Sequence, residues 1–257
     1  MSKLNIEPGS SPAKAQFNIT VTDKGPYLVY GRPPLAEQFI MPDEKDESWY
    51  FQEGLSFSTE AEPTALCRCG SSNRKPYCDG THTKANWNPT LTASTDEALM
   101  DQVEVFEGEE ISMVDNEKYC SFARFCHPHG DAWNLIGRSA NNPEVKRLVM
   151  REVSMCPSGR LTIRDNKSNQ PHELPFEPSL GLIEDVTIGA SGGLWIRGGI
   201  PMNREDGHTY EIRNRVVVCR CGQSANKPYC DGTHAAIKWR DHLEGKPLGT
   251  TLPEPVY

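Results

Sequence analysis

The sequence predicts an α+β fold that is rich in β-structure, with two similar β-modules paired within the chain and a small α+β module between them. Three observations support this prediction. A cysteine-rich loop occurs twice, each copy follows the same order of short strands, and a hairpin, a helix and a strand separate the copies. We therefore expect a flexible tail at 1–17 and modules at 18–95, 96–170 and 171–257.

The first β-module begins with two predicted strands. Residues 18–22 alternate apolar and polar side chains, as a half-buried strand does, and residues 27–30 are rich in β-formers. Lys24-Gly-Pro26 predicts the turn between them. Residues 36–63 contain an acidic segment and the aromatic run 49–51. We interpret them as an inserted, solvated loop, with a docking site for a partner as the alternative for its carboxylates.

The second β-module repeats this order. Strands are predicted at 186–188 and 194–197, with a turn at 191–193 and a break at 198–201. A further extended segment, 210–218, leads directly into the second cysteine loop.

The alignment of the two copies shows that the whole β-unit is duplicated. Tyr27 aligns with Leu194 at an offset of 167 positions, whereas Cys67 aligns with Cys219 at an offset of 152. The difference of 15 residues is the extra length of the insertion in the first copy. A repeated unit of this size indicates two modules of one kind rather than two chance loops.

The middle segment has a different pattern. Residues 103–106 and 111–113 predict a hairpin, and residues 161–163 a closing strand. Asn142 is a predicted N-cap with Pro143 at the first helical position. The helix should end before Cys156, since proline follows it. Four apolar residues keep helical spacing on one face: Val145, Leu148, Val149 and Val153.

Composition excludes several classes of function. The net charge of −8 argues against nucleic acid or an anionic membrane as the main partner. No apolar run reaches the roughly 18 residues of a membrane span, and residues 1–12 lack the pattern of a secretory signal. Nine cysteines in such a chain indicate metal ligands rather than disulfides, so we expect a cytoplasmic protein.

Each cysteine loop has the spacing C-x-C-x8-C-x3-H. Three thiolates and one imidazole form a complete set of metal ligands. The two sulfurs of Cys-x-Cys can reach one iron, and the later cysteine and histidine can bind a second. The candidate ligands are Cys67, Cys69, Cys78 and His82 in the first loop, and Cys219, Cys221, Cys230 and His234 in the second.

The residues after the third cysteine predict a short helix in each loop. Asp79 and Asp231 are expected N-caps of helices at 81–87 and 233–239. Zinc could also occupy such a ligand set, although its paired ligands usually have C-x2–4-C spacing. Two further alternatives to metal ligation are disulfide bonds and buried, unreactive thiols.

Both loops resemble the CDGSH iron–sulfur (NEET-type) family, whose pattern C-x-C-x2-[ST]-x3-P-x-C-D-G-[SAT]-H they match at every fixed position. The resemblance implies one [2Fe–2S] cluster in each loop, with two cysteines on one iron and the cysteine and histidine on the other. It also implies that the two modules pair, as they do in a homodimer or in a chain with two motifs. The long segment between the motifs departs from the best-known members, as does the lack of a predicted membrane anchor.

The middle segment carries the remaining cysteines, Cys120, Cys126 and Cys156. Small bacterial ferredoxins use C-x2-C-x2-C followed later by Cys-Pro. When Cys120 and Cys126 are aligned with the first and third cysteines of this motif, Ala123 occupies the position of the second cysteine. The segment resembles divergent single-cluster ferredoxins, in which C-x5-C is followed by Cys-Pro-Ser-Gly, here residues 156–159.

Three thiolates imply a [3Fe–4S] cluster in the middle module. The alternative is a [4Fe–4S] cluster with His127 or His129 as fourth ligand, and either histidine is otherwise an ordinary polar loop residue. Three aromatic residues are expected to pack around the cluster and limit water access: Phe122, Phe125 and Trp133.

These sites predict one-electron transfer between redox partner proteins. The sequence contains no nucleophile–base arrangement, phosphate loop or dinucleotide fingerprint, so we expect no enzymatic activity. The alternative is cluster transfer to apo-acceptor proteins, or redox, iron or pH sensing, because an imidazole loses its metal bond when it is protonated. We expect a monomer with pairing inside the chain rather than an obligate dimer.

Overall fold

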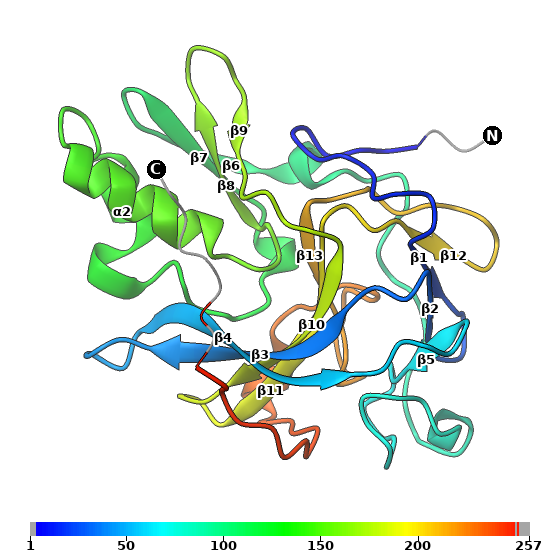
Figure 1. Ribbon diagram of the computed structural model, residues 1–257. Helices are drawn as coiled ribbons and strands as arrows, with labels where there is room; N and C mark the ends of the chain where they lie inside the picture. Colours follow the sequence, from blue (N-terminus) through cyan, green and yellow to red (C-terminus); the bar gives the residue numbers. More distant parts are fainter. Residues whose placement is uncertain (1–3, 250, 252–257) are drawn as a thin grey trace.

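The computed structural model describes residues 4–249 and residue 251, and Figure 1 shows three sheets beside a few helices. The strands are β1 Asn18–Val21, β2 Tyr27–Tyr30, β3 Leu35–Pro42, β4 Ser48–Phe57, β5 Thr64–Leu66, β6 Glu104–Glu107, β7 Ile111–Asp115, β8 Leu161–Asp165, β9 Pro171–His172, β10 Ser179–Asp185, β11 Ala190–Arg197, β12 Met202–Arg204 and β13 Arg215–Val218. The α-helices are α1 Ala132–Ile136, α2 Pro143–Ser154 and α3 Thr233–Ala236, and the 3₁₀ helices are η1 Thr81–Thr83, η2 Leu99–Gln102, η3 Glu117–Tyr119 and η4 Pro128–Gly130. This is the predicted β-rich α+β fold.

Two of the sheets contain strands from both β-modules, which are called the first repeat (18–95) and the second repeat (171–257) from here on. Their strand orders are β12–β1–β2–β5 and β13–β11–β10–β3–β4. The first repeat supplies β1, β2 and β5 to one sheet, and the second supplies β10, β11 and β13 to the other. The first repeat also contributes the β3–β4 hairpin to the five-stranded sheet, where β3 pairs in parallel with β10. The second repeat contributes β12 to the four-stranded sheet, where it pairs in parallel with β1. Neither sheet is complete without the other repeat, so the predicted pairing within the chain is confirmed.

The main hydrophobic core joins the same two repeats. Ile19 and Val21 of β1 are fully buried together with Leu180 of β10 and Ile196 of β11. Burial of side chains from both repeats in one cluster stabilises the exchanged arrangement, since each repeat alone would expose these apolar surfaces.

The predicted inserted loop at 36–63 is wrong. β3 and β4 form a long antiparallel hairpin at the edge of the five-stranded sheet, and only residues 43–47 make a turn. The alternating strand pattern is hidden because β3 is buried on both faces, and its polar residues Glu37 and Gln38 are 1% and 0% exposed. Periodicity of apolar residues cannot identify such a strand.

The predicted strand at 186–188 and turn at 191–193 are also wrong. β10 ends at Asp185, residues 186–189 form the turn, and β11 already begins at Ala190. The glycines of β11 serve close packing rather than a turn. A Cβ on Gly193 would lie 2.4 Å from Cγ1 of Val217 and 2.6 Å from the carbonyl oxygen of Val218. The strand predicted at 194–197 is confirmed.

The N-terminal segment is packed rather than a flexible tail over its described part. The backbone N–H of Glu7 donates to the carbonyl of Ile212 at 2.9 Å, and that of Ala13 donates to Gly199 at 2.8 Å. The side chain of Glu7 is buried. The prediction of a tail is therefore wrong for residues 4–17, and residues 1–3 lie outside the described part of the chain.

The middle module follows the predicted hairpin–helix–strand order. Its sheet has the order β6–β7–β8–β9, and α2 packs on one face through Val149 and Val153, both fully buried. Asn142 caps α2 as predicted, with its side-chain oxygen accepting from the N–H of Val145 at 3.2 Å. β9 pairs with β8, so this module extends past the predicted boundary at residue 170. Within 4–249 and 251, no helix has the length and apolar character needed to span a membrane.

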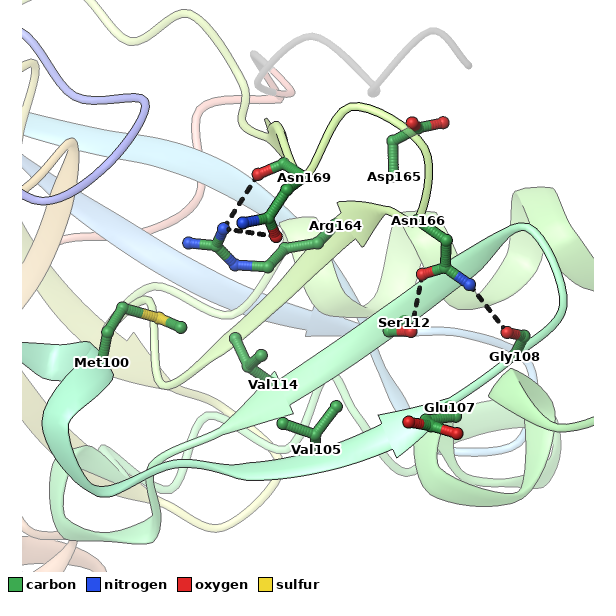
Figure 2. A pocket seen from close by; sticks show the side chains of 10 residues that line it. All are labelled: Met100, Val105, Glu107, Gly108, Ser112, Val114, Arg164, Asp165, Asn166 and Asn169. Atoms are coloured by element: carbon green, nitrogen blue, oxygen red, sulfur yellow. Dashed lines mark hydrogen bonds between the residues drawn. The ribbon is translucent and has the colours of Figure 1, made fainter.

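The other face of this sheet carries an open cavity of about 490 Å³ (Figure 2). Val105 and Val114 form its apolar floor, and the side chain of Asn166 bonds to Ser112 and to the carbonyl of Gly108 at its rim. Its lining contains no cysteine or histidine. The cavity is therefore separate from the predicted metal ligands.

Candidate metal centres

The first cysteine loop places its four predicted ligands in two pairs. The Sγ atoms of Cys67 and Cys69 are 3.8 Å apart, and Sγ of Cys78 is 3.3 Å from Nδ1 of His82. The loop folds back along β5, because the N–H of Cys67 donates to Pro76 and that of Cys78 donates to Ala65. The two halves of the loop are thereby held side by side.

The second loop repeats this geometry. Cys219 and Cys221 are again 3.8 Å apart, and Cys230 again lies 3.3 Å from Nδ1 of His234. The hydroxyl of Ser224 donates to the carbonyl of Tyr229 at 2.7 Å, as that of its counterpart in the first loop does. Two segments with the same sequence pattern therefore build the same ligand arrangement.

The predicted helices after the third cysteine are much shorter than expected. They are reduced to the single turns η1 and α3, which follow Gly80 and Gly232 in the left-handed conformation, with φ of 84° and 85°. The prediction of the aspartates as N-caps is wrong, because Gly80 and Gly232 occupy the N-cap positions. Each aspartate instead accepts a hydrogen bond from the residue two positions further along the chain. Asp79 accepts from the N–H of Thr81, and Asp231 from that of Thr233, both at 3.0 Å.

Both ligand pairs fit one tetrahedral metal ion each. A tetrahedral ion with bonds of about 2.3 Å to sulfur holds two thiolates roughly 3.8 Å apart, and with an imidazole bond near 2.0 Å it holds a sulfur and a nitrogen about 3.5 Å apart. The separations of 3.8 Å and 3.3 Å agree with these values. The residues present therefore suit a metal at each pair without rearrangement.

The two pairs of a loop do not converge on one point. Within the described part of the chain, a single set of three His, Cys, Asp or Glu residues has its ligand atoms all within 4.8 Å of one another, and it contains no cysteine. In a mononuclear tetrahedral site, all four ligand atoms would lie within about 4 Å of one another. The loops thus separate their ligands more widely than one zinc ion requires.

The pKa values of the outer-loop ligands shift in both directions. The hydrogen bond shared within each Cys-x-Cys raises the pKa of Cys69 and Cys221, and burial raises that of Cys78 and Cys230. The neighbouring thiol of Cys69 and the backbone N–H groups of Ser72 and Gly70 lower the pKa of Cys67 to about 6. The pKa of Cys219 falls to about 7 for the same reason, with Cys221 as its partner. Burial and the charge of Arg220 lower the pKa of His234 to about 4, so its imidazole is neutral at neutral pH. Thiolate and neutral imidazole are the forms that coordinate metals.

The middle site gathers Cys120, Cys126 and Cys156 near η3, α1 and the end of α2. Cys126 and Cys156 pack at the edge of the core that contains Val149 and Val153. Burial raises the pKa of Cys126, and the negative charges of the other two cysteines raise it further. The three thiols therefore lie near enough to interact electrostatically, and ligation of a metal would relieve this effect. Ala123 is buried and brings no ligand atom to this site.

The predicted aromatic shield is partly present. Trp133 packs against the same core as Cys126 and Cys156, and its indole N–H donates to Asp115 at 3.1 Å. Phe125 is buried in a different cluster, where its ring lies 4.7 Å from that of Phe51. Phe122 is 45% exposed and is therefore no barrier to water.

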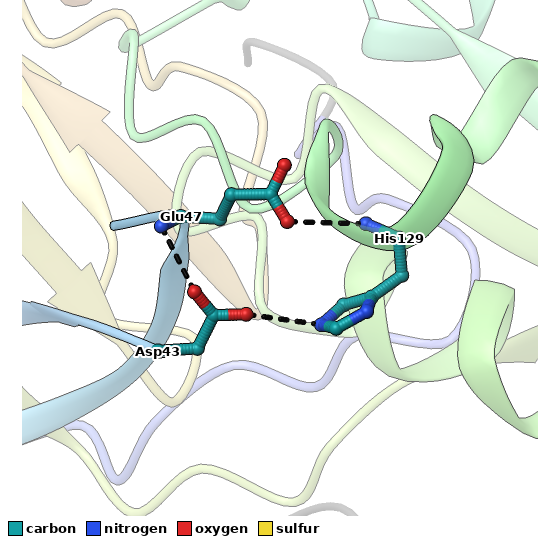
Figure 3. A group of neighbouring side chains, drawn as sticks. All are labelled: Asp43, Glu47 and His129. Carbon is teal, nitrogen blue, oxygen red and sulfur yellow. Dashed lines mark hydrogen bonds and ion pairs between the residues drawn. The ribbon is translucent and has the colours of Figure 1, made fainter. Parts of the chain in front are cut away.

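The two histidines near the middle site are paired with carboxylates. Nδ1 of His127 lies 3.0 Å from Asp131. Figure 3 shows His129 turned toward the hairpin turn of the first repeat, where its Nε2 lies 3.1 Å from Asp43 and its backbone N–H donates to Glu47. These contacts bind the acidic turn 43–47 to the middle module. The carboxylates of this turn therefore meet a partner inside the chain.

Two buried arginines support the cysteine loops and were not among the predicted site residues. Arg68 donates to the carbonyls of Gly25 and Thr22, and Arg220 pairs with Glu184 and Asp241. They occupy the central position of each Cys-x-Cys and are 1% and 3% exposed. The identity of this residue in both copies was the signal that could have revealed them.

A third buried arginine, Arg215 of β13, connects the second repeat to the middle site. Its guanidinium donates to the carbonyl oxygens of Cys156 at 2.6 Å and Ser154 at 2.8 Å, and it pairs with Glu173. The backbone around the third cysteine of the middle site therefore depends on a strand of the second repeat. No local sequence pattern indicates this contact.

Comparison with known families agrees with this arrangement. The family described as "Iron-binding zinc finger CDGSH type" matches residues 24–83 and 191–235, and the family described as "Divergent 4Fe-4S mono-cluster" matches residues 106–166. Comparisons with curated proteins and with solved structures gave no match. The matched regions contain all eleven predicted ligands. The chain is therefore an iron–sulfur protein in which two CDGSH-type regions flank a divergent mono-cluster region.

Proposed function

We propose that this chain is a one-electron carrier with a [2Fe–2S] cluster in each CDGSH-type loop and a [3Fe–4S] cluster in the middle module. The observation that carries the proposal is the division of each loop into two ligand pairs, each with tetrahedral spacing, that do not converge on one ion. Bound clusters would each accept and release a single electron. No catalytic role is part of this proposal.

The three-iron assignment of the middle site rests on its ligands. Three cysteines supply three thiolates, and buried Ala123 takes the place of a fourth. His127 and His129 are engaged with Asp131 and Asp43, which favours the three-iron cluster over a four-iron cluster with a histidine ligand. The four-iron cluster is the alternative, and the name of the matched family favours it.

The protein largely excludes water from the Cys-x-Cys pair of each outer loop. Cys67, Cys69, Cys219 and Cys221 are all 5% exposed or less. Buried ligands favour electron transfer because the surrounding protein controls solvent access and hence the redox potential of the site. All nine cysteines are free thiols, and a cytoplasmic location is proposed because free thiols persist in reducing surroundings.

Cluster transfer or sensing is the second candidate function. It is favoured by the half-buried position of Cys78 and His82, which leaves one edge of the first site near solvent. An acceptor protein could approach that edge, whereas the corresponding residues of the second loop are buried.

One experiment separates the two functions. The oxidised, anaerobically prepared protein is incubated with an apo-ferredoxin, and a second sample is cycled with dithionite and ferricyanide. Electron transfer predicts reversible bleaching of the visible spectrum over repeated cycles with no iron lost to the apo-ferredoxin. Stoichiometric transfer of iron and sulfide within minutes, with no reversible reduction, would instead identify a cluster donor.

A further inference from the structure

The two CDGSH-type loops differ in what surrounds them. The second loop lies against the middle module, where a Cβ on Gly232 would lie 3.2 Å from Cβ of Phe122 and 3.4 Å from the carbonyl oxygen of Cys120. The side chain of Asn226 donates to the carbonyl of Lys118 at 2.9 Å. At the equivalent position of the first loop, a Cβ on Gly80 would meet nothing within 4 Å.

A second segment covers the second loop from another direction. The N–H groups of Thr92 and Ala93 both donate to the carbonyl of Lys227, and the hydroxyl of Thr92 donates to Ala225. As a result Cys230 and His234 are 3% and 5% exposed. We call the side of each loop that carries its third cysteine and its histidine the histidine edge. In the second loop, the surrounding chain covers this edge.

The first loop keeps its histidine edge open. Gly80 is exposed, and Cys78 and His82 are half-buried. The loop follows β5, on the opposite side of the molecule from α2 of the middle module (Figure 1). It does meet the C-terminal part of the chain at Gly70, whose carbonyl accepts from Trp239 at 3.3 Å.

The open edge also carries a different charge from the closed one. Lys24, Arg74 and Lys84 are exposed around it, and Gly25 lies so close that a Cβ there would be 3.7 Å from Nε2 of His82. The aligned residues of the second repeat are all neutral: Ser191, Asn226 and Ala236. The basic residues of the second loop, Arg220 and Lys227, are buried, and Lys238 beyond it donates to the carbonyl of Ile188.

The acids near the open edge do not cancel these bases. Asp79 is turned into the loop by bonds from the N–H groups of Asn73 and Thr81, and Asp23 lies beside Lys24. Glu205 adds a third acid, since it accepts from the N–H of Asp23 at 2.7 Å, and Lys75 of the loop adds a fourth base. Arg204, which lies 3.9 Å from Asp23, pairs with Asp206 at 3.3 Å. Four cations against three anions leave this edge with a positive excess on a chain whose net charge is −8. Such a local reversal of sign attracts and orients a partner of opposite charge.

We propose that the rim formed by Lys24, Arg74 and Lys84 is the docking surface for an acidic one-electron carrier protein. Electrons then enter and leave the chain through the first loop alone, which we call the external port. This proposal rests on the electron-transfer function. The second loop, enclosed between the first loop and the middle module, is then an internal site that no partner contacts directly.

Binding of an acidic plant-type ferredoxin, used as the probe, to the cluster-loaded chain tests the docking surface. The variant K24E/R74E/K84E should weaken binding at least tenfold at low salt and abolish most of its dependence on ionic strength. The matched control R138E/R147E/K167E makes the same change of charge at exposed residues of the middle module and should leave binding within twofold. Cross-links from the ferredoxin should map to the first loop.

Several outcomes would overturn the proposal. Equal weakening by both triple variants would mean that only the total charge matters, and cross-links at residues 225–238 would place the port at the second loop. Tighter binding of basic cytochrome c at the first loop, or self-association of this acidic chain through it, would assign the surface to another occupant. The K24E/R74E/K84E variant should still be reduced reversibly by dithionite. Weaker binding by this variant then reflects loss of the docking surface and not loss of the clusters' redox activity.

Discussion

At the scale of single residues, the buried arginines of the two Cys-x-Cys segments have different partners. Arg68 donates its hydrogen bonds to backbone carbonyls, including those of Pro89 and Asp23. Arg220 instead pairs with two buried acids, Glu184 and Asp241. Burial raises the pKa of Glu184 to about 8, whereas the charge of Arg220 helps to hold the pKa of Asp241 below its usual value, so Asp241 carries the negative charge of this group. Removal of a cation from a buried anion is more costly than removal of a donor from carbonyls, because the charge remains unpaired in a medium of low polarity.

Replacement of these arginines should therefore have unequal effects. R220M should lower the free energy of unfolding by about 3–5 kcal/mol, and R68M by about 1–3 kcal/mol. Thermal melting and the rate of iron loss to a chelator measure both effects. The double variant R220M/D241N should recover part of the loss. An R68M protein that is less stable than R220M would contradict this electrostatic account.

Glu152 is a buried carboxyl group without a hydrogen-bond partner among the described residues. Burial raises its pKa to about 8, and the charges of Asp131 and Glu47 contribute in the same direction. The folded chain therefore holds a proton that the unfolded chain releases above about pH 4.5. The wild-type protein should lose stability as pH rises from about 5 to 8, by up to about 1.4 kcal/mol per pH unit.

The variant E152Q should lack this slope, because glutamine does not ionise. Its melting temperature should exceed that of the wild type by an amount that grows between pH 5 and pH 8. E144Q, at an exposed position in the first turn of the same helix, is the control and should melt like the wild type throughout. A constant difference between E152Q and wild type across this range would show that Glu152 is ionised in the folded chain.

At the scale of elements, the two cysteine loops contact each other through their first glycines. A Cβ on Gly70 would lie 2.3 Å from the carbonyl oxygen of Cys221, and a Cβ on Gly222 would lie 2.3 Å from that of Cys69. Each loop therefore occupies the space that a side chain of the other would need. This reciprocal contact, together with the exchanged strands β3 and β12, holds the two outer sites in one body.

Alanine variants of two glycines isolate this contact. Gly70 and Gly80 have similar left-handed backbones, with φ of 79° and 84°, but Gly80 has open space around it. G70A should therefore destabilise the protein by about 1–3 kcal/mol more than G80A, which corresponds to several degrees in melting temperature. Equal melting temperatures of the two variants would mean that the loops are not in contact in solution.

The β3–β4 hairpin is the other element that joins modules. Trp49 lies between Arg151, whose guanidinium carbon is 3.3 Å from the centre of the indole ring, and His129, at 4.6 Å between ring centres. Cation–π and edge contacts of this kind stabilise an interface by about 0.5–2 kcal/mol. The hairpin that the first repeat adds to the shared sheet thus anchors the middle module.

At the scale of the whole molecule, local patterns in the sequence predict which side chains lie together in each outer loop, but not how the modules are arranged. The ligand spacing predicts which cysteine and histidine side chains lie together in each outer loop, and the pairs at 3.8 Å and 3.3 Å agree with it. The N-cap at Asn142 and the end of α2 were also predictable, since caps and proline act locally.

The exchange of β3 and β12 between repeats could not be predicted in this way. Strand exchange depends on pairing between residues more than a hundred positions apart, such as Leu35 with Leu180. Buried polar residues in β3 and glycines in β11 hid the strands themselves, because both residue types are also typical of loops. The contacts of Arg215 with the middle site are equally long-range.

The unequal cover of the two outer loops predicts unequal dynamics in the intact protein. Hydrogen exchange of the backbone in residues 79–84 should be at least tenfold faster than in residues 231–236, although the two loops make the same internal bonds. The second loop provides the internal control, since its Asp231–Thr233 bond matches Asp79–Thr81 at 3.0 Å. Equal exchange in both loops would contradict the closed position of the second site.

Metal and sulfide content tests the central claim most directly. Anaerobically prepared protein should contain about seven irons and about eight acid-labile sulfides per chain, from two [2Fe–2S] clusters and one [3Fe–4S] cluster, and the oxidised sample should show the EPR signal of a three-iron centre. About eight irons with no such signal would replace the three-iron cluster by a four-iron one. Two zinc ions per chain without sulfide in the outer loops would contradict the account.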